Sequence, residues 1–581
     1  MARLAPQLRR LLPYLRRHQR GLARGIACLL ATTALSVAGP WVLRYAIDDL
    51  TLGITRGKLI GYAGLIVGLA LVEGLFRYGM RMILIGISRD IEYELRNDVF
   101  SHLARLDASY YHQNRIGDIM SRATNDMSAV RQVLGPGIMY TANTIATFAA
   151  SVFLMFRISP RLLGLSLVPL LFVSFLVRHF GRRIHDRFEK VQEQLAAINA
   201  LVQENLAGAR VVRAYAQEEA ELARFEAANR EHLRRNRELI KMFGSLYPGI
   251  QLLMGSGVLL VIWLGGRMVI AGTITLGEFV AFGAYLAMLH WPMIALGWVV
   301  NLFERGEASM GRIGAILDAV PAIRDEQPEP VAAIHGDVLF RELSFGYGGE
   351  PVLRDIDLRV PAGTTVAIVG PTGSGKSTLV NLIPRLFDAP PGQLLIDGRD
   401  VRGIPLATLR GAIGFVPQET FLFSDSVREN IAFGLRDGHE RVEWAAGVAQ
   451  LARDVSGLPK GYETFVGERG ITLSGGQKQR TAIARAIATD PRILILDDAL
   501  SSVDTETEEE ILRGLRGVMK SRTTFLVSHR VSTVKDADLI VVLREGRIVE
   551  RGRHDELVAK GGFYADLHRR QLLEREMEKT A

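Results

Sequence analysis

The sequence predicts a multidomain protein: an N-terminal all-α domain of six transmembrane helices followed by an α/β domain. Two observations carry this prediction. Uncharged apolar stretches long enough to cross a bilayer occur in the first half of the 581 residues. In the second half, short β-branched runs alternate with helical stretches, and one of these runs leads into a glycine-rich phosphate loop.

The expected spans are six apolar stretches. A bilayer is crossed by about 20 apolar residues, and the stretches cover residues 25–43, 59–76, 132–156, 162–177, 242–266 and 279–303. Buried helices of a large soluble protein are the alternative, but six such runs confined to one half of the chain disfavour it. The first stretch could also be a signal peptide, although its N-terminal region is long and five more spans follow.

The distribution of positive charge orients these spans. The chain has a formal net charge of +8, and its arginines crowd residues 3–24 and the long connections 77–131 and 178–241. Because positive charge concentrates in cytoplasmic loops, we expect a multi-pass protein of the cytoplasmic membrane whose second half lies in the cytoplasm. This pattern indicates membrane lipids, and no nucleic acid, as partners. Cys28 is the only cysteine, so no disulfide can form within one chain.

The polar segments of the first half have helical periodicity. Residues 5–18 alternate leucine and arginine pairs, which predicts an amphipathic helix at the cytoplasmic interface. The two long connections lack Gly/Pro breaks for long stretches, so we expect them to continue the membrane helices into the cytoplasm. Each then turns through a short element, at 107–122 and at 207–219. The tyrosines there favour docking onto another domain, and a solvated hairpin is the alternative.

Beyond Asp318 the composition changes to a proline-rich, acidic linker. The runs TVAIVG, RILILDD, TTFLVSHR and LIVVLREGRIVERG follow it, and they predict a mainly parallel sheet that ends in a hairpin around Glu545 and Gly546. The expected domains are therefore a transmembrane domain at 1–320, a linker at 321–335, a nucleotide-binding domain at 336–570 and a C-terminal tail at 571–581.

The phosphate loop is the segment GPTGSGKST, which lies between the run TVAIV and a helical stretch. Its glycines let backbone N–H groups face phosphates, its lysine reaches the β- and γ-phosphates, and its serine offers a hydroxyl to Mg²⁺. An aromatic residue upstream would stack on the base, with ordinary strand packing as the alternative. The expected nucleotide-binding residues are Tyr347, Gly370, Thr372, Gly373, Ser374, Gly375, Lys376, Ser377 and Thr378.

Further motifs follow the phosphate loop in order: FVPQE, LSGGQKQR, LILDD, SSVD and LVSHR. Their order and spacing over residues 340–565 resemble the ATP-binding cassette (ABC) transporters. The six spans with two long cytoplasmic connections resemble the exporter type of that family. The resemblance implies a P-loop ABC nucleotide-binding domain that uses ATP and Mg²⁺ to drive transport.

The resemblance also assigns roles to single residues. Gln418 would sense the γ-phosphate and, with Ser377 and Asp497, hold Mg²⁺. His529 would contact the γ-phosphate, with a purely structural role as the alternative. Asp504 would bridge two nucleotide sites.

In this family two nucleotide domains sandwich two ATP molecules, each lying between the phosphate loop of one domain and the LSGGQ motif of the other. The signature residues that would act in trans are Leu473, Ser474, Gly475, Gly476 and Gln477. They would open a helix whose N-terminal N–H groups suit a γ-phosphate. Because the chain has one nucleotide domain, the resemblance implies a half-transporter and an obligate dimer.

Asp498 stands where the family pattern usually has glutamate, the residue that activates the attacking water. Aspartate is shorter by one C–C bond, about 1.5 Å, and misplacement on this scale can cost on the order of 100-fold in rate. We therefore expect a hydrolysis-impaired site, paired in a heterodimer with a second half-transporter that carries glutamate. This arrangement resembles bacterial heterodimeric multidrug and lipid exporters. A homodimeric lipid flippase and an ATP-gated channel or regulator are the alternatives.

The expected substrates are hydrophobic or amphipathic molecules such as drugs, lipids or peptides. Ionisable groups inside a membrane usually face a cavity, and aromatic or Met-rich walls accept varied apolar shapes. Snorkelling arginines and ordinary helix packing are the alternative. The candidate residues on the second and sixth spans are Glu73, Arg77, Arg81, His290, Trp291, Met293 and Trp298.

Overall fold

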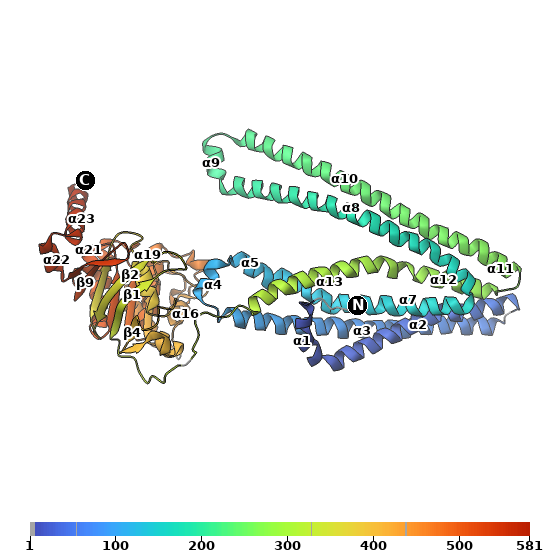
Figure 1. Ribbon diagram of the computed structural model, residues 1–581, viewed down its shortest axis with the longest axis horizontal. Coiled ribbons are helices and arrows are strands. Elements are labelled where there is room, and N and C mark those ends of the chain that lie inside the picture. The colour runs from blue at the N-terminus through green and yellow to red at the C-terminus, as the bar shows by residue number, and fades with distance from the viewer. Residues whose placement is uncertain (1–5, 54, 327, 436–438, 581) are drawn as a thin grey trace. The chain divides into compact units, whose positions relative to one another are not determined.

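A computed structural model of the chain describes residues 6–53, 55–326, 328–435 and 439–580 (Figure 1). The chain divides into two compact units. The first comprises Met1–Ala104 and Ile116–Asp318, and the second comprises Arg105–Arg115 and Ala319–Ala581.

The first unit is built from long helices joined by short turns. In chain order these helices are η1 Leu8–Leu11, α1 Leu12–Arg17, α2 Gln19–Thr51, α3 Arg56–Leu103, α5 Ile116–Ser121, α6 Met127–Gln132, α7 Ile138–Ile158, α8 Pro160–Ala207, α9 Ala209–Ala214, α10 Glu218–Leu260, α11 Gly266–Ile270, α12 Leu276–Met288 and α13 His290–Leu317. Three π-helical turns, η2 Arg122–Asp126, η3 Val133–Gly137 and η4 Val261–Gly265, join α5 to α7 and α10 to α11.

Four helices of this unit are long and apolar enough to cross a membrane among the residues that the structure describes: α2, α3, the helix 116–158 and the helix 218–270. The helical membrane domain expected from the sequence is therefore confirmed. The further spans expected at 162–177 and 279–303 fall in α8 and in α12 and α13, and the count of six stays a prediction.

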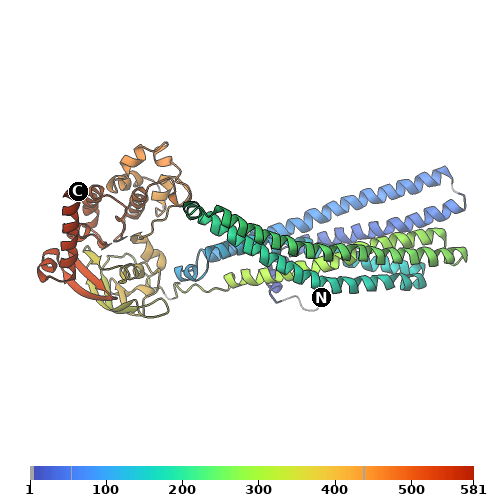
Figure 2. The same ribbon diagram turned by 90° about the horizontal axis from the view of Figure 1, so that it is seen from above.

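The second long connection is formed by α8 and α10, which extend the expected spans at 162–177 and 242–266 without a break, as the sequence predicted. The side chain of Ser159 caps α8 by accepting the N–H of Leu162 at 3.3 Å, and the helix then runs for 48 residues, about 70 Å at 1.5 Å per residue. Helix α10 returns beside it (Figures 1 and 2). Between them, Val211 of α9 and Tyr215, the residue that follows α9, are 61% and 73% exposed, so the end of the hairpin carries the apolar surface expected of a docking element.

The helix expected at residues 5–18 is present as η1 and α1, and two of its leucines are buried. Leu8 and Leu11 pack within the protein in a cluster that includes Ile313 and Ile316 of α13. Arg10 donates two hydrogen bonds to Asp318 at 2.8 and 2.6 Å. The N-terminal segment is thus fixed to the end of α13, and its position at the membrane interface stays a prediction.

The second unit contains two sheets. The strands are β1 Val338–Phe345, β2 Leu353–Val360, β3 Thr365–Val369, β4 Leu394–Ile396, β5 Arg399–Asp400, β6 Ile413–Val416, β7 Ile493–Asp497, β8 Thr523–Val527, β9 Leu539–Arg544 and β10 Arg547–Gly552. The larger sheet has the order β10-β9-β3-β8-β7-β6 and is parallel except for the β9–β10 hairpin. This confirms the predicted parallel sheet and its terminal hairpin. The antiparallel sheet β2-β1-β4-β5 was not predicted.

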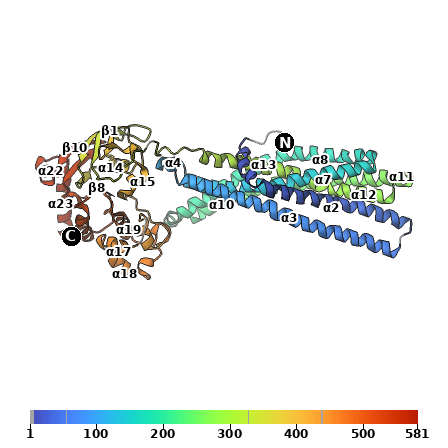
Figure 3. The same ribbon diagram turned by 90° about the horizontal axis from the view of Figure 1, so that it is seen from below.

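The antiparallel sheet packs on one face of the parallel sheet, and helices cover the opposite face. The helices of this unit are α4 Ala108–Gln113, α14 Lys376–Leu382, α15 Leu406–Gly411, α16 Val427–Ala432, α17 Val442–Val448, α18 Ala452–Ser456, α19 Gly475–Ala488, α20 Thr505–Met519, α21 Val531–Val534, α22 His554–Lys560 and α23 Phe563–Thr580, with short 3₁₀ turns at Val401–Gly403, Gly461–Glu463 and Glu468–Gly470. Figure 3 shows α17 and α18 gathered beside α19.

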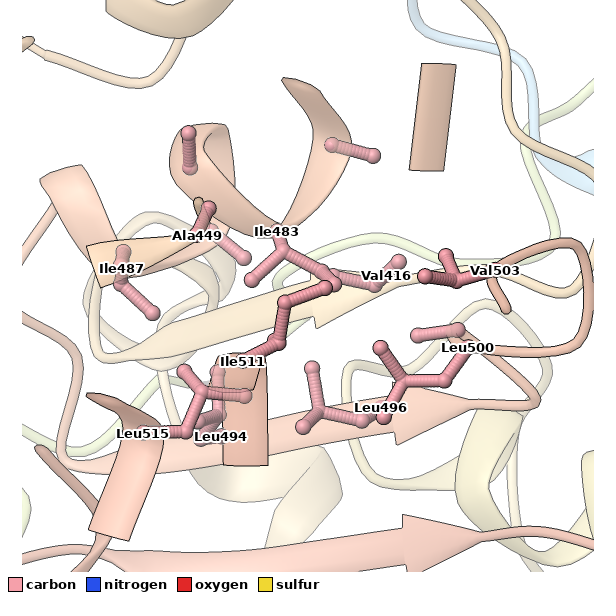
Figure 4. Packing of buried hydrophobic residues seen from close by; sticks show 14 of the residues in the cluster. Val416, Ala449, Ile483, Ile487, Leu494, Leu496, Leu500, Val503, Ile511 and Leu515 are labelled. Carbon is pink, nitrogen blue, oxygen red and sulfur yellow. The ribbon is translucent and has the colours of Figure 1, made fainter. Parts of the chain in front are cut away.

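Strand β7 shows why this core is apolar on both faces of the sheet. Ile493 and Ile495 pack in the cluster that includes the antiparallel sheet. Leu494 and Leu496 point the other way, into the cluster that holds Ile483 of α19 (Figure 4). Because successive side chains of a strand face opposite sides, a parallel strand covered on both sides is a continuous aliphatic run.

Part of the first long connection belongs to the second unit. Asp107 accepts the N–H of Ala322 at 3.0 Å, and the ring of His112 on α4 stacks on Phe387, with the ring centroids 6.1 Å apart. The docking element expected at 107–122 therefore packs on this unit through its first residues.

Candidate functional site

The carboxyl ends of four neighbouring parallel strands form the candidate site. Strands β3, β8, β7 and β6 lie in this order, and the carboxyl ends of parallel strands meet at one edge of a sheet, where ligands of α/β proteins bind. The phosphate loop follows β3, His529 follows β8, Asp497 ends β7 with Asp498 directly after it, and Gln418 follows β6. They line a cavity of about 200 Å³ formed by Val352, Thr372, Gly373, Gly375, Lys376, Ser377, Thr378, Gln418, Asp497, Asp498, Val527 and His529.

The phosphate loop curls around its own lysine. Gly375, which precedes α14, has φ +98°, and a Cβ there would lie 2.8 Å from a methyl carbon of Leu353, so only glycine fits. Lys376 is 7% exposed, and its ammonium donates to the carbonyls of Gly370 at 3.0 Å and Pro371 at 2.8 Å. Burial lowers the pKa of Lys376. The loop thus holds a buried cation beside the cavity.

Asp497 and Ser377 form a polar pair at the floor of the site. The hydroxyl of Ser377 donates to Oδ1 of Asp497 at 3.1 Å, and Asp497 is only 2% exposed. Burial, and secondarily the charge of Asp498, raises the pKa of Asp497. A buried carboxylate of this kind is stabilised when a cation binds next to it.

Asp498 adopts an unusual backbone conformation, with φ +49°. Aspartate is one of the few non-glycine residues that enter this left-handed region readily. Its N–H donates to the carbonyl of Val527 at 3.0 Å, and its carbonyl accepts the N–H and the hydroxyl of Ser501 at 3.3 and 3.0 Å. The main chain is therefore held on both sides, and these bonds oppose a shift that would carry the carboxylate further into the cavity.

His529 lines the same cavity on the side of β8. Burial lowers the pKa of His529, the positive charge of Lys376 lowers it further, and the carboxylate of Asp498 opposes both effects. Because the ordinary histidine pKa is about 6.5, the imidazole is mainly neutral at pH 7.

Tyr347 lies outside the cavity but next to the phosphate loop. Its hydroxyl donates to the hydroxyl of Thr378 at 3.2 Å. Its ring packs edge-on against Phe345 and Phe387, with centroids 5.2 and 4.9 Å away, and remains 53% exposed. The ring of Tyr347 therefore packs against its neighbours and still exposes surface on which a base could stack.

Two residues of the phosphate loop, Gly370 and Ser374, do not line the cavity. The hydroxyl of Ser374 is buried without a hydrogen-bond partner.

The signature residues are not part of this cavity. They open α19, as expected: the Ser474 hydroxyl accepts the N–H of Gln477 at 3.3 Å, and the Gln477 side chain accepts the N–H of Ser474 at 3.0 Å, a capping box. A Cβ on Gly476 would lie 3.2 Å from the carbonyl of Ser502, so the start of α19 lies close to the loop that follows β7. Asp504 ends that loop and caps α20 by accepting the N–H of Thr507 at 2.9 Å.

Gln479 was not predicted and connects these two elements. It is 4% exposed. Its side chain donates to the hydroxyl of Ser501 and accepts the N–H of Ser502, both at 2.9 Å. Because Ser501 in turn donates to the carbonyl of Asp498, Gln479 links the signature helix to the backbone of Asp498. Its place within LSGGQKQR was the only sequence signal.

A second cavity, of about 260 Å³, lies within the helical unit. Both apolar and polar side chains line it: Thr32, Thr33, Ser36, Glu73, Arg77, Met80, Arg81, Met139, Tyr140, Asn143, Thr147, Met288, Trp291 and Pro292. Glu73 and Arg77 form an ion pair on α3. Trp298 is outside the lining and packs edge-on against Tyr140. The side chains of His290 and Met293 lie outside the described residues.

Comparisons with known proteins match both halves of the chain. The family model of the ABC transporter transmembrane region matches residues 22–293, and that of the ABC transporter domain matches residues 353–501. The probable multidrug resistance ABC transporter ATP-binding/permease protein YheI of Bacillus subtilis is 38% identical over 94% of this chain and 94% of its own length. The ATP-dependent lipid A-core flippase of Syntrophus aciditrophicus is 37% identical over 97% of this chain and 94% of its own length.

A solved structure extends the likeness to the three-dimensional fold. The structure of a bacterial Atm1-family ABC exporter with ATP bound has a TM-score of 0.79 and 30% sequence identity to this chain. The match covers 95% of this chain and 98% of the other.

Proposed function

Because the chain belongs to the ABC transporter family and has the half-transporter architecture of its exporters, we propose that it forms a heterodimer and supplies the hydrolysis-impaired nucleotide site. The coarser function is established: the chain is an ATPase coupled to transport, a multi-pass protein of the cytoplasmic membrane with a cytoplasmic nucleotide domain. The proposal concerns the partner, the roles of single residues and the substrate.

The position of Asp498 carries the heterodimer proposal. A carboxylate shorter than glutamate by about 1.5 Å lies on a backbone that hydrogen bonds hold from both sides. Two copies of this chain would then lack a well-placed base in both sites, whereas a partner with glutamate supplies one. The flippase relative favours a homodimeric lipid flippase as the second candidate.

The cavity residues suit a nucleoside triphosphate with Mg²⁺. We assign the phosphates to the loop N–H groups and Lys376, and the base to the exposed ring of Tyr347. Mg²⁺ prefers oxygen ligands and is usually bound by one or two carboxylates plus substrate phosphates. The paired oxygens of Ser377 and Asp497 provide such ligands, with Gln418 on the same cavity.

A role for His529 at the γ-phosphate predicts a pH-dependent ATP affinity. The pKa of His529 is lowered in the nucleotide-free site, and a phosphate anion next to the ring would raise it. Binding then takes up protons, so we expect affinity to increase as the pH falls from about 8 to about 5.5, through the ordinary histidine range. The measurement is the dissociation constant of ATP as a function of pH in the wild type and in His529→Ala. The variant is the control, because its pH profile shows the effect of protonation of ATP itself. Identical pH profiles would remove the proposed contact.

The cavity of the helical unit is the proposed substrate site. Methionine and aromatic side chains accept varied apolar shapes, and the hydroxyl, amide and charged groups on the same wall suit an amphipathic molecule. We therefore propose drugs or lipids with a polar head as substrates, in line with the names of both relatives. Glu73 and Arg77 would orient the polar part.

Trp291 tests this site because its ring lines the cavity and is 57% exposed. We expect Trp291→Ala to raise by roughly tenfold the substrate concentration that half-saturates ATP-driven transport, since a lost aromatic contact costs on the order of 1 kcal/mol or more. The measurement is ATP-dependent uptake of fluorescent phospholipids and dyes into inside-out vesicles containing the chain and its partner. Trp263→Ala, an equally exposed tryptophan outside the cavity, is the control. An equal shift in both variants would contradict the site.

A further inference from the structure

The C-terminal helix α23 is fixed to the nucleotide domain at its first turn. Glu550 accepts the N–H groups of Phe563 at 2.6 Å and Tyr564 at 3.2 Å. Tyr564 is fully buried in the domain core, and its hydroxyl hydrogen-bonds the ring of His554 at 2.8 Å. The residues that follow on the same face of the helix therefore have a fixed position.

Gln571 lies about two turns beyond Tyr564, at 3.6 residues per turn, and its amide holds the main chain on both sides of Arg530. The side-chain NH₂ donates to the carbonyl of His529 at 2.7 Å, and the side-chain oxygen accepts the N–H of Val531 at 2.8 Å. Val531 is the first residue of α21, where backbone N–H groups have no partner within the helix. One neutral side chain thus satisfies both groups.

The segment that Gln571 holds is short. Three residues, Ser528–Arg530, connect β8 to α21. On the sheet side, the hydroxyl of Ser528 accepts the N–H of Arg530 at 3.0 Å. The carbonyl of His529 accepts a hydrogen bond from Gln571 of the C-terminal helix. The orientation of this histidine in the cavity therefore depends on a residue from the other end of the domain.

We propose that Gln571 is a positioning residue. It fixes the backbone of the segment Ser528–Arg530, which contains His529, and through this contact the C-terminal helix sets the affinity for ATP. The effect on ATP rests on the proposed role of His529, whereas the contact itself does not. Two measurements on the full-length chain separate these parts.

Hydrogen exchange at the amide of Val531 tests the contact. In Gln571→Leu this amide loses its acceptor, and we expect exchange roughly fivefold faster, the factor that one ordinary hydrogen bond provides. Gln571→Glu keeps an acceptor oxygen for Val531 but turns a second oxygen, which cannot donate, toward the carbonyl of His529, so we expect it to keep only part of the protection. Leu572→Ala, a change at the next, exposed position of α23, should exchange like the wild type. Unchanged exchange in Gln571→Leu would overturn the proposal.

A double-mutant cycle on the dissociation constant of ATP tests the positioning role. We expect Gln571→Leu to weaken ATP binding roughly fivefold, and to have no further effect in a His529→Ala background, because a residue that acts through another is not additive with it. Additive losses would show that Gln571 supports the domain only in general and would overturn its role. If His529→Ala leaves ATP affinity unchanged, the link to ATP falls with the proposed function of His529, whatever the exchange result.

Discussion

Asp498→Glu is expected to raise the ATPase activity of the chain purified alone by on the order of 100-fold, the cost attached to misplacing a catalytic group by about 1 Å. The added methylene extends the carboxylate by about 1.5 Å toward the attacking water. The hydrogen bonds of Asp498 to Val527 and Ser501 are formed by main-chain atoms of this residue, so the longer side chain should start from the same point. The measurement is steady-state hydrolysis of the chain reconstituted in lipid, without a partner.

Two controls make the result interpretable. Glutamate tolerates φ +49° less readily than aspartate, so thermal unfolding of both proteins shows whether activity was lost with stability. Asp498→Asn keeps the length of aspartate and removes the base, and it should leave the activity of the chain alone near its low starting value. Robust hydrolysis by the wild-type chain alone, unchanged by glutamate, would contradict the heterodimer and favour a homodimeric transporter.

The fold could be predicted where the sequence pattern is local. A parallel strand buried on both faces is a run of aliphatic residues, so β3, β7 and β8 were recognisable. The antiparallel sheet was not predicted because the pairing that joins its two halves is nonlocal. Strands β1 and β2 are neighbours in sequence, as are β4 and β5, but β1 also pairs with β4, which has only three residues and lies more than forty residues away. The packing of η1 was not predicted for the same reason, since its leucines contact α13, which comes last in the sequence of the helical unit.

The site could be predicted to the extent that its residues lie in continuous motifs. Lys376, Asp497, Asp498 and His529 reach one cavity because their strands end at the same edge. Gln479 and Gln571 were missed for a different reason. No sequence motif of its own marks either glutamine as functional. Each one matters because its side chain forms hydrogen bonds with two groups that come within reach only in the folded chain.

Ser474→Arg in the chain co-expressed with its partner should abolish ATP turnover, whereas Asp498→Ala should reduce it far less. In the proposed heterodimer, the signature of this chain acts on the partner's competent site, and Asp498 belongs to the slow one. Arginine removes the hydroxyl that caps α19, a loss of about 1 kcal/mol. It also places a long cation at the helix N-terminus, where the helix dipole favours an anion. The side chain then occupies the surface meant for the γ-phosphate.

Ser474→Ala separates these effects, because it removes the cap without adding bulk or charge. We expect this variant to lose stability but to retain part of its turnover, measured as ATPase activity of the co-purified complex alongside its thermal unfolding. The order of the two main variants decides the assignment. In a homodimer both residues serve every site, so Asp498→Ala would reduce turnover at least as much as Ser474→Arg. That result would assign this chain to a symmetric transporter in which Asp498 is the working base.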